Sequence, residues 1–452
     1  MELLERILES GNLNEAYKRV YANKGASGVD GETVEELLDY LQIHKAELLE
    51  NIRVRKYKPQ PVRRVEIPKG NGKMRQLGIP TVVDRVIQQA IAQVLSPVYE
   101  KQFSESSYGF RPNRSCEQAV LRSLELLNDG YDWIVDIDLE RFFDTVHHDR
   151  LMNIIHRTVE DGDVLSLIRK FLVSGVMVGN TYEETPIGTP QGGNLSPLLS
   201  NIMLNELDKE LEARGLRFVR YADDCNIFVG SQKAAERVMK SITDFIERKL
   251  GLKVNATKSR IGRPNQIKFL GFGYFTDKDG KYQAKPHKQS IEKLKRKLKA
   301  LTCRKWSISL DARLRKLKQQ IMGWVNYFRI AKMKTVLLQI DAKLRKRIRV
   351  IIWKQWKKPP KRYEALRKLG ANHSNAYRTA NCRKGYQYVC GSATIHATIT
   401  NKRLEQRGLT SLSNLYAKVH LQRLLRVEPP YTERYVRWCE RGEALAVSPY
   451  SI

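Results

Sequence analysis

The apolar residues of this chain recur in some stretches with the two-residue period of a strand and in others with the 3.6-residue period of a helix. One short stretch shows the two-residue period clearly. Val135, Ile137 and Leu139 alternate with Asp136 and Asp138. Because successive side chains of a strand point to opposite faces, this alternation predicts a strand with one apolar face and two carboxylates on the other. Carboxylates on the open face of a buried strand are costly unless they bind a cation or a hydrogen-bond donor.

A second strand pattern surrounds a polar turn. The apolar runs Phe218-Val219 and Ile227-Phe228-Val229 flank the tetrad Tyr221-Ala222-Asp223-Asp224. This arrangement predicts a hairpin with two adjacent aspartates at its tip. Taken alone, the tetrad favours an ordinary solvated turn over a catalytic one.

Helical patterns lie between and around these strands. Amphipathic helices are predicted at 195–211 and 234–250, and with the strands they indicate an α+β unit from about 126 to 280. Residues 1 to about 125 combine short helices with a basic, strand-like segment at 61–69.

From about residue 287 the apolar period becomes that of a helix. Three successive stripes predict a three-helix bundle with apolar residues inward and Lys and Arg outward. The stripes are formed by Ile291, Leu294, Leu298 and Leu301, then by Leu314, Leu317, Ile321, Trp324 and Phe328, and then by Ile340, Leu344, Ile348 and Ile352. Residues from 361 onward are basic and weakly periodic, and we expect a small separate module there.

The charge of the chain is large and concentrated. Its 452 residues carry a formal net charge of +31, and a chain of this length suggests two or three domains. Between residues 281 and 360, 25 Lys and Arg stand against three acidic residues, a surplus of 22. A local excess of this size predicts a polyanionic partner such as nucleic acid. A solvated basic bundle is the alternative, but it would leave strong self-repulsion.

The cysteines and the lengths of the apolar runs indicate in which cellular compartment the protein is expected. The six cysteines form no C-x-x-C pair, so we expect neither a zinc ribbon nor a nuclease with a Cys-bound zinc, but reduced cytosolic thiols. The chain starts as an acidic amphipathic helix rather than a secretion signal. No run approaches the roughly 18 apolar residues of a membrane span. We therefore expect a cytoplasmic protein with no membrane association.

The two strand patterns acquire a chemical meaning when they are considered together. If the strands pair antiparallel, Asp138, Asp223 and Asp224 converge. Three carboxylates suit two Mg²⁺ ions roughly 4 Å apart, the arrangement used for in-line phosphoryl transfer. One ion would activate the attacking hydroxyl of a primer, and the other would hold a triphosphate and its leaving pyrophosphate.

A glycine-rich run, Gly188 to Pro197, predicts a loop that leads into a helix. Ser196 suits the N-cap and Pro197 the first helical position. The run is not a phosphate-binding P-loop, because no Lys-Ser/Thr pair follows the glycines. Its glycines would allow a nucleotide or template to approach the backbone closely, and a plain turn before a helix explains it equally well.

Ten short motifs follow one another at plausible spacing through most of the chain. They are Asn12–Ala16 with Gly25–Gly31, Arg63–Lys69, Arg75–Pro80, Tyr108–Pro112, Asp138–Phe143, Gly188–Pro197, Tyr221–Asp224, Gly251–Asn255, Lys258-Ser259 and Phe269–Phe272. In this order they resemble the reverse transcriptases encoded by bacterial group II introns, especially the compact group IIC type. An ordered set of motifs is far more specific than any one of them.

The resemblance implies a right-hand polymerase of the α+β class, with fingers and a palm built on an antiparallel sheet, an α-helical thumb and a small basic C-terminal module. We expect the N-terminal extension and fingers in residues 1–125, and the palm with some fingers elements in 126–285. A three-helix thumb (the maturase X region) should follow in 286–360, and a nucleic-acid-binding module in 361–452.

The resemblance also implies a catalytic set. Asp138, rather than Asp136, matches the first metal-binding carboxylate, because it stands five residues before the aromatic Phe143. Asp223 matches the second metal ligand, and Asp224 is its acidic neighbour. All three are expected to be catalytic and to hold two Mg²⁺ ions, for which Mn²⁺ can substitute.

Further positions match residues that contact the substrates. The residues expected to bind the dNTP are Lys69 and Arg75 as a triphosphate clamp, Phe143 as the gate against a 2′-OH, Gln191 in the nucleotide pocket, and Lys258 near the phosphates. The residues expected to contact template or primer are Arg63, Arg111, Gly192, Tyr221 and Ala222.

The implied function is an RNA-directed DNA polymerase that adds dNTPs to a DNA or RNA primer on an RNA template. The resemblance further implies an intron-encoded protein that binds the intron RNA and assists its splicing and its mobility into target DNA. We expect it to be active as a monomer in the bacterial cytoplasm, associated with the nucleoid. Unlike longer relatives, the chain has no recognisable zinc-nuclease motif, so we do not expect it to cleave the second strand of a DNA target by itself.

Two alternatives remain open from the sequence. The first is a splicing cofactor that binds intron RNA without polymerising, against which the three intact aspartates argue. The second is a reverse transcriptase of a retron, a diversity-generating element or a CRISPR-linked system. The roughly 180 residues after Phe272 favour the intron type over the shorter retron type.

Overall fold

The computed structural model describes residues 2–68, 74–188 and 192–427, with side chains described up to residue 420. The chain forms two compact units, Met1–Phe269 and Leu270–Ile452. This division falls before the predicted palm–thumb boundary at 285/286. The hairpin that precedes the boundary belongs to the second unit because its backbone bonds to that unit: Lys332 N–H donates to the Ala284 carbonyl at 2.8 Å.

The first unit contains a four-stranded antiparallel sheet that matches both predicted strand patterns. Strand β3 lies between β7 and β8, and β6 pairs with β7 at the edge. The alternation predicted for β3 is confirmed, because Val135, Ile137 and Leu139 are buried in the main apolar core. In spatial order the strands are β6 (Arg217–Tyr221), β7 (Asp224–Val229), β3 (Trp133–Ile137) and β8 (Arg260–Gly262).

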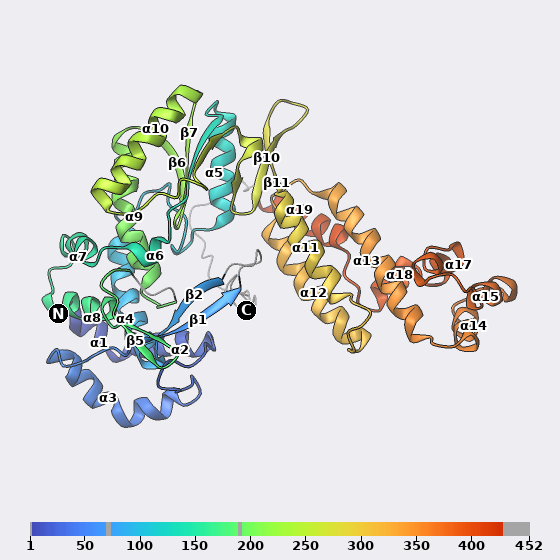
Figure 1. Ribbon diagram of the computed structural model, residues 1–452, viewed down its shortest axis with the longest axis horizontal. Helices are drawn as coiled ribbons and strands as arrows, with labels where there is room; N and C mark the ends of the chain where they lie inside the picture. The colour runs from blue at the N-terminus through green and yellow to red at the C-terminus, as the bar shows by residue number, and fades with distance from the viewer. Residues whose placement is uncertain (1, 69–73, 189–191, 428–452) are drawn as a thin grey trace. The chain divides into compact units, whose positions relative to one another are not determined.

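Three helices cover this sheet (Figure 1). Helix α9 (Ser196–Ala213) packs on β6, and α10 (Gln232–Phe245) packs on β3, β7 and β8. Their apolar residues share one core with the inward residues of the strands. Helix α5 (Cys116–Asn128) contacts β6 and contributes no residue to that core. The predicted 195–211 and 234–250 helices are thus confirmed, the second continuing as the π-helix Ile246–Leu250.

A second four-stranded sheet, in the order β2-β1-β4-β5, lies in the same unit. The predicted basic strand is its β1, which pairs antiparallel with β2 and parallel with β4. The strands are β2 (Met74–Ile79), β1 (Val62–Pro68), β4 (Val176–Val178) and β5 (Thr181–Glu183). The other elements of the unit are α1 (Leu3–Leu8), α2 (Ser10–Ala22), α3 (Leu37–Arg53), α4 (Val82–Glu100), α6 (Phe142–Thr145), α7 (His148–His156), α8 (Gly162–Leu172), the 3₁₀ turn Pro264–Gln266 and β9 (Lys268–Phe269).

The second unit opens with a hairpin of β10 (Phe272–Thr276) and β11 (Tyr282–Pro286) and continues as helices. The three predicted helices are α11 (Lys288–Leu301), α12 (Leu310–Tyr327) and α13 (Lys334–Gln355). Their stripes face inward, since Leu294, Leu317, Ile321, Leu344 and Ile348 are at most 3% exposed. Apolar periodicity therefore located these helices correctly.

The sequence predicted a separate module from residue 361. In the described part of that stretch, up to residue 427, the last helix, α19, packs back against α12 and α13 within the second unit. The helices of this stretch are α14 (Pro359–Lys368), α15 (His373–Ala380), α16 (Tyr386–Val389), α17 (Ala393–Thr398), α18 (Asn401–Gln406) and α19 (Leu412–Val427).

Asp341 attaches α19 to α13. Its carboxylate accepts hydrogen bonds from the backbone N–H groups of Leu412 and Ser413 at 2.8 and 2.9 Å, and from the hydroxyls of Ser411 and Ser413. It is 2% exposed. A buried carboxylate at a helix N-terminus satisfies donors that have no partner within the helix.

We predict that Asp341→Ala lowers the free energy of unfolding of the second unit by about 1–3 kcal/mol, because it leaves these donors without an acceptor. Hydrogen exchange should show the loss of protection concentrated in α19. Asp311→Ala is the matched control, because Asp311 is an exposed acid on α12 whose ion pair with Arg407 is 3.8 Å long. Equal destabilisation by the two variants would contradict the anchoring role of Asp341.

Candidate active site

The two aspartates of the tetrad lie at the tip of the β6–β7 hairpin, as predicted. Tyr221 pairs with Asp224 across the strands, so Ala222 and Asp223 form the turn. Ala222 has φ +56° and is 6% exposed. A left-handed conformation is unfavourable for a residue with a Cβ, so contacts around this turn must hold it in place.

Asp138 directly follows β3, on the strand next to the hairpin. Ile137 of β3 pairs with Cys225 of β7. Asp138 is the next residue after Ile137, and Asp224 is the residue just before Cys225, so the two acids leave the paired strands at the same end. The Asp138 backbone is held on both sides, because its N–H donates to Ser259 Oγ at 3.0 Å and its carbonyl accepts from Asn255 N–H at 2.9 Å. The antiparallel pairing thus brings together the ends of two strands that carry all three predicted catalytic carboxylates.

Burial and neighbouring acids raise the pKa values of Asp223 and Asp224. For Asp224, burial is the largest cause, followed by the charges of Asp223, Asp136 and Asp138, and together they raise its pKa to about 7, although the residue as a whole is exposed. Burial also raises the pKa of Asp223; Asp138 adds to that shift, while Arg75 opposes it. Such a concentration of negative charge favours the binding of a cation.

Two cations already lie beside the strand carboxylates. Lys258 Nζ is 2.9 and 3.2 Å from the two carboxylate oxygens of Asp138. Arg260 Nε is 3.5 Å from Asp136, where burial still raises the carboxyl pKa to about 6. Asp136 is thus paired with an arginine on the neighbouring strand, and Asp138 is the strand acid that follows β3 at the hairpin end.

Within the described residues, no three acidic, His or Cys side chains stand close enough together to form a ready metal cluster. The donor set is nonetheless of the right chemistry, because carboxylate oxygens are the ligands that Mg²⁺ prefers. A metal ion on Asp138 would have to replace the ammonium of Lys258. The residues therefore fit a divalent cation chemically, with a lysine as the competing counter-ion.

The residues predicted to bind the dNTP are only partly described. Lys69 and Gln191 lie outside the described residues. Arg75 is exposed on β2, and its charge acts on Asp223. Phe143 is half-buried on α6, where it packs edge-on against the buried Phe142 with ring centroids 5.1 Å apart. Two of the five, Arg75 and Lys258, thus act electrostatically on the aspartates that are predicted to be catalytic.

The residues predicted to contact template or primer lie in separate parts of the first unit. Tyr221 and Ala222 belong to the β6–β7 hairpin, Arg63 is half-buried on β1, and Gly192 is exposed. A Cβ on Gly192, whose φ is +122°, would lie 2.3 Å from the Gly78 carbonyl oxygen. Glycine is therefore needed here for close approach to β2.

Arg111, which was predicted to contact template or primer, is instead buried with internal partners. It is 7% exposed, its Nε and Nη2 donate to Glu100 at 2.8–3.1 Å, and its Nη1 donates to the carbonyls of Ser104 and Ser107. A guanidinium with these internal partners is not available to a phosphate. The sequence could not reveal this, because the acceptors are set by the fold.

The loop before α9 also differs from the prediction in one detail. The helix begins at Ser196 itself, and Leu195 occupies the N-cap. Pro197 does lie in the first turn, as predicted. Leu195 is 2% exposed, so its burial, rather than capping chemistry, sets the start of the helix.

Several residues around the site were given no role by the sequence. Ser259 and Asn255 hold the Asp138 backbone, and Arg220 and Asp208 form an ion pair below the hairpin. The sequence did contain one indication of that pair. Arg220 follows two apolar residues of its strand, and Asp208 occupies a position in the apolar stripe of α9. Charged residues at inward positions point to a buried partner.

Comparisons with known proteins agree with this fold and site. The profile of the reverse transcriptase (RNA-dependent DNA polymerase) family matches residues 67–274, and that of the group II intron maturase-specific domain matches residues 291–370. The α+β unit is therefore a reverse transcriptase domain. With both matches in order along one chain, the protein belongs to the group II intron reverse transcriptase/maturase family.

Its relatives include proteins of bacteria and yeast. Protein YkfC of Escherichia coli is 34% identical over 310 residues, which are 60% of this chain and 81% of YkfC. The group II intron-encoded protein LtrA of Lactococcus lactis is 41% identical over 208 residues, 45% of this chain and 34% of LtrA. The putative COX1/OXI3 intron 2 protein of Saccharomyces cerevisiae is 30% identical over 57% of this chain and 37% of its own length. The match thus spans most of YkfC but only about a third of the other two.

One solved structure, a partial Cas6-RT-Cas1–Cas2 complex, contains a chain 24% identical over 55% of this protein and 43% of that chain, with a TM-score of 0.36. A likeness at this level carries no argument.

Across the described residues, none of the helices combines the length and apolar character that a membrane span requires.

We predict that Ser259→Ala lowers kcat about tenfold, the effect of one lost hydrogen bond on a catalytic residue, because the Asp138 backbone loses its side-chain partner. Primer extension under saturating dNTP measures it. Thr257→Ala is the control, since the Thr257 hydroxyl bonds Asn255 in the same turn and not Asp138. Equal loss in the two variants would assign the effect to the turn as a whole.

Proposed function

We propose that this chain copies RNA into DNA at a site formed by Asp138, Asp223 and Asp224, and that it acts within a group II intron. The observation that carries the proposal is the β3–β7 pairing, which brings the three carboxylates to neighbouring strand ends. Membership in the family supports the reaction class. The assignment of each residue rests on its chemistry and on the motif in which it stands.

Two divalent cations, Mg²⁺ with Mn²⁺ as a substitute, would be held by these three aspartates. When bound, they supply an activated primer hydroxyl and neutralise the charge of the leaving pyrophosphate. The raised pKa values of Asp223 and Asp224 support this, because burial and neighbouring acids disfavour their charged forms and a bound cation would favour them. Lys258 then serves as the cation that compensates Asp138 in the metal-free protein and is released toward the triphosphate.

The incoming dNTP would be held by basic side chains from the second sheet. Arg75 is placed to act on Asp223, and we propose that it and Lys69 clamp the triphosphate, as guanidinium and ammonium groups suit phosphate oxygens. Phe143 would stand under the sugar as the gate against ribonucleotides, with Gln191 lining the pocket. Arg63, Gly192, Tyr221 and Ala222 remain the proposed template and primer contacts.

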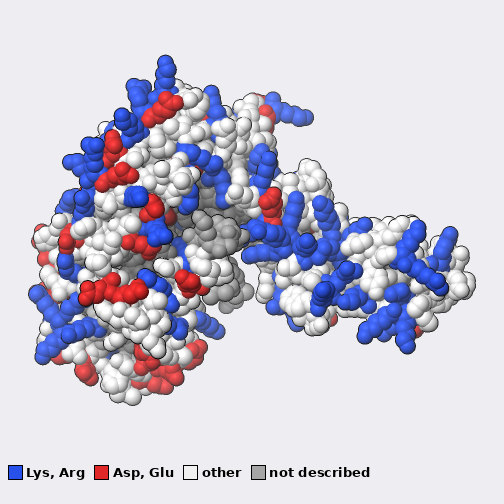
Figure 2. Space-filling view, in the orientation of Figure 1, with Lys and Arg blue, Asp and Glu red and all other residues white. Residues whose placement is uncertain are grey.

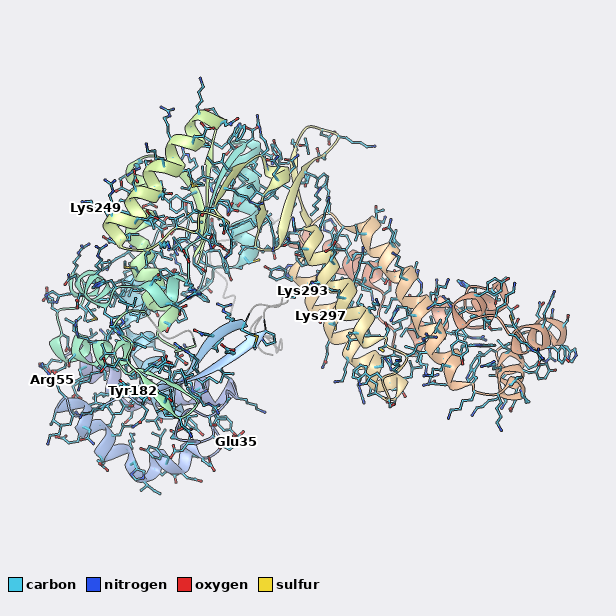
Figure 3. The ribbon with its side chains drawn as sticks, in the orientation of Figure 1. Glu35, Arg55, Tyr182, Lys249, Lys293 and Lys297 are labelled. Carbon is cyan, nitrogen blue, oxygen red and sulfur yellow. The ribbon has the colours of Figure 1, made fainter. Side chains whose placement is uncertain are left out.

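The second unit supplies the surface for nucleic acid. In the view of Figure 2 its face carries Lys and Arg with few acidic residues, whereas the face of the first unit mixes both signs. On α11, Lys293 and Lys297 are one turn apart and extend from the helix into solvent (Figure 3). We propose that α11–α13 act as the thumb along the template–primer duplex, with the helices after 361 as an RNA-binding extension.

The wider biological role is proposed from the family. Its parts are binding of the parent intron RNA, assistance to splicing, and mobility into target DNA by a monomer in the bacterial cytoplasm, near the nucleoid. A splicing cofactor without polymerase activity is the competing function. The dense, electrostatically strained carboxylates argue against it, because a protein that only binds RNA gains nothing from acids that oppose binding.

We predict that primer extension on an RNA template requires Mg²⁺ or Mn²⁺ and falls at least about a thousandfold in Asp223→Asn, because one metal-binding carboxylate is lost. RNA binding by the same variant should be unchanged and should weaken steeply with salt in both proteins. Asp311→Asn, an exposed acid of the second unit, is the control. Extension retained by Asp223→Asn would refute the metal assignment, and absent extension by the unmodified protein would leave the binding role.

Phe143→Val should admit ribonucleotides. The smaller side chain removes the steric contact with a 2′-OH, so the ratio of kcat/KM for dNTP over rNTP should fall about a hundredfold, the size of a well-defined steric discrimination. Single-nucleotide incorporation assays measure it. Phe142→Leu, at the buried neighbour, is the control and should leave the ratio unchanged. An unaltered ratio in Phe143→Val would remove Phe143 as the gate.

A further inference from the structure

A buried ion pair lies directly beneath the catalytic hairpin. Arg220, in β6, and Asp208, in α9, both have side chains with 0% exposure. Arg220 Nε and Nη2 donate to the two carboxylate oxygens of Asp208 at 2.7 and 2.5 Å. Desolvating both charges costs several kcal/mol, so such a pair adds little net stability over apolar residues of the same size. Its presence therefore calls for a reason other than stability.

The third nitrogen of the guanidinium shows what the pair supports. Nη1 of Arg220 donates to the backbone carbonyl of Ala222 at 3.0 Å and to Oδ1 of Asn201 at 3.0 Å. The Ala222 carbonyl belongs to the peptide that leads into Asp223. Because a peptide unit is planar, holding this oxygen sets the plane from which the Asp223 chain continues.

The same network closes on the other side of the turn. Asn201 Nδ2 donates to the Gly109 carbonyl at 2.8 Å, and a Cβ on Gly109 would lie 2.2 Å from the Ala222 nitrogen. The backbone of Arg220 is also bonded to this segment, since its carbonyl accepts from Tyr108 N–H at 2.9 Å. Ala222 is thus held through its carbonyl by Arg220 and enclosed at its nitrogen by Gly109.

These contacts explain how a strained turn can carry the catalytic pair. Ala222 adopts φ +56°, a left-handed conformation that is unfavourable for a residue with a Cβ. A strained turn keeps one conformation only if its surroundings determine it.

We infer that Arg220, with Asp208 and Asn201, is a positioning residue of the polymerase: it sets the Ala222–Asp223 peptide so that Asp223 and Asp224 present their oxygens to the metal ions. Arg220 is fully buried and touches neither metal nor substrate. The inference rests on the proposed metal role of the aspartates, and metal binding can be measured apart from polymerisation.

The test uses the full chain with both partners replaced, Arg220→Met with Asp208→Leu. Apolar replacement of a whole buried pair leaves no unpaired charge, so the variant should still fold, which a cooperative thermal unfolding transition checks. Mn²⁺ affinity, measured by the electron paramagnetic resonance of free Mn²⁺, should fall about tenfold, as should kcat, while KM for template–primer stays the same. Arg220→Lys, which keeps a cation beside Asp208 but lacks the fork that reaches Ala222, should show the same loss and covers the case in which the double variant does not fold.

Arg349→Met is the matched control, because this arginine is 3% exposed and donates to the Ile399 carbonyl at 2.9 Å in the second unit. It should lower stability without changing Mn²⁺ affinity. Wild-type Mn²⁺ affinity and kcat in a folded Arg220 variant would overturn the inference. If the unmodified protein binds Mn²⁺ and fails to extend a primer, the proposed function fails, while weakened Mn²⁺ binding in the variants still supports the positioning role.

Discussion

The antiparallel pairing of β3 with β7 is the constraint on which the site depends. Its register joins Ile137 to Cys225, so Asp138 leaves one strand where the Asp223–Asp224 turn enters the other. Because side chains alternate between the faces of a sheet, a slip of one residue would drive these acids into the apolar core and bring core residues out. Burial of Val135 and Ile137 therefore fixes the position of the carboxylates as firmly as any contact that they make themselves.

Concentrating acids in this way opposes folding, and the structure offsets it with cations placed around them. Lys258 pairs with Asp138, Arg260 pairs with Asp136, and the charge of Arg75 opposes the rise in the pKa of Asp223. Each compensates without neutralising the site completely, since the pKa of Asp224 still rises to about 7. In the metal-free protein the negative charge of the carboxylates is therefore only partly compensated. A polymerase of this family would compensate the rest by binding divalent ions.

The second unit carries an excess of positive charge. Its helices bury apolar stripes and expose a large excess of Lys and Arg, and one of its few acids, Asp341, is used internally to hold α19. Repulsion among the exposed cations is relieved when a phosphate backbone lies against them and releases its counterions. Acidic residues are concentrated at the proposed metal site, and basic residues on the proposed nucleic-acid surface.

The sequence by itself determined what local periodicity encodes. It predicted the alternation of β3, the β6–β7 hairpin and the helices α11–α13, because a period of two or of 3.6 depends only on neighbours along the chain. Ordered motifs identified the family, and they supplied the aspartates that we propose as catalytic. Tertiary structure alone decided the partners of charged residues: Arg111 turned inward to Glu100, Arg220 found Asp208 and the Ala222 carbonyl, α19 returned to α12 and α13, and Lys258 reached Asp138 from 120 residues away. A charged side chain looks the same in sequence whether it meets water or a buried acceptor, and only the folded chain brings that acceptor within reach.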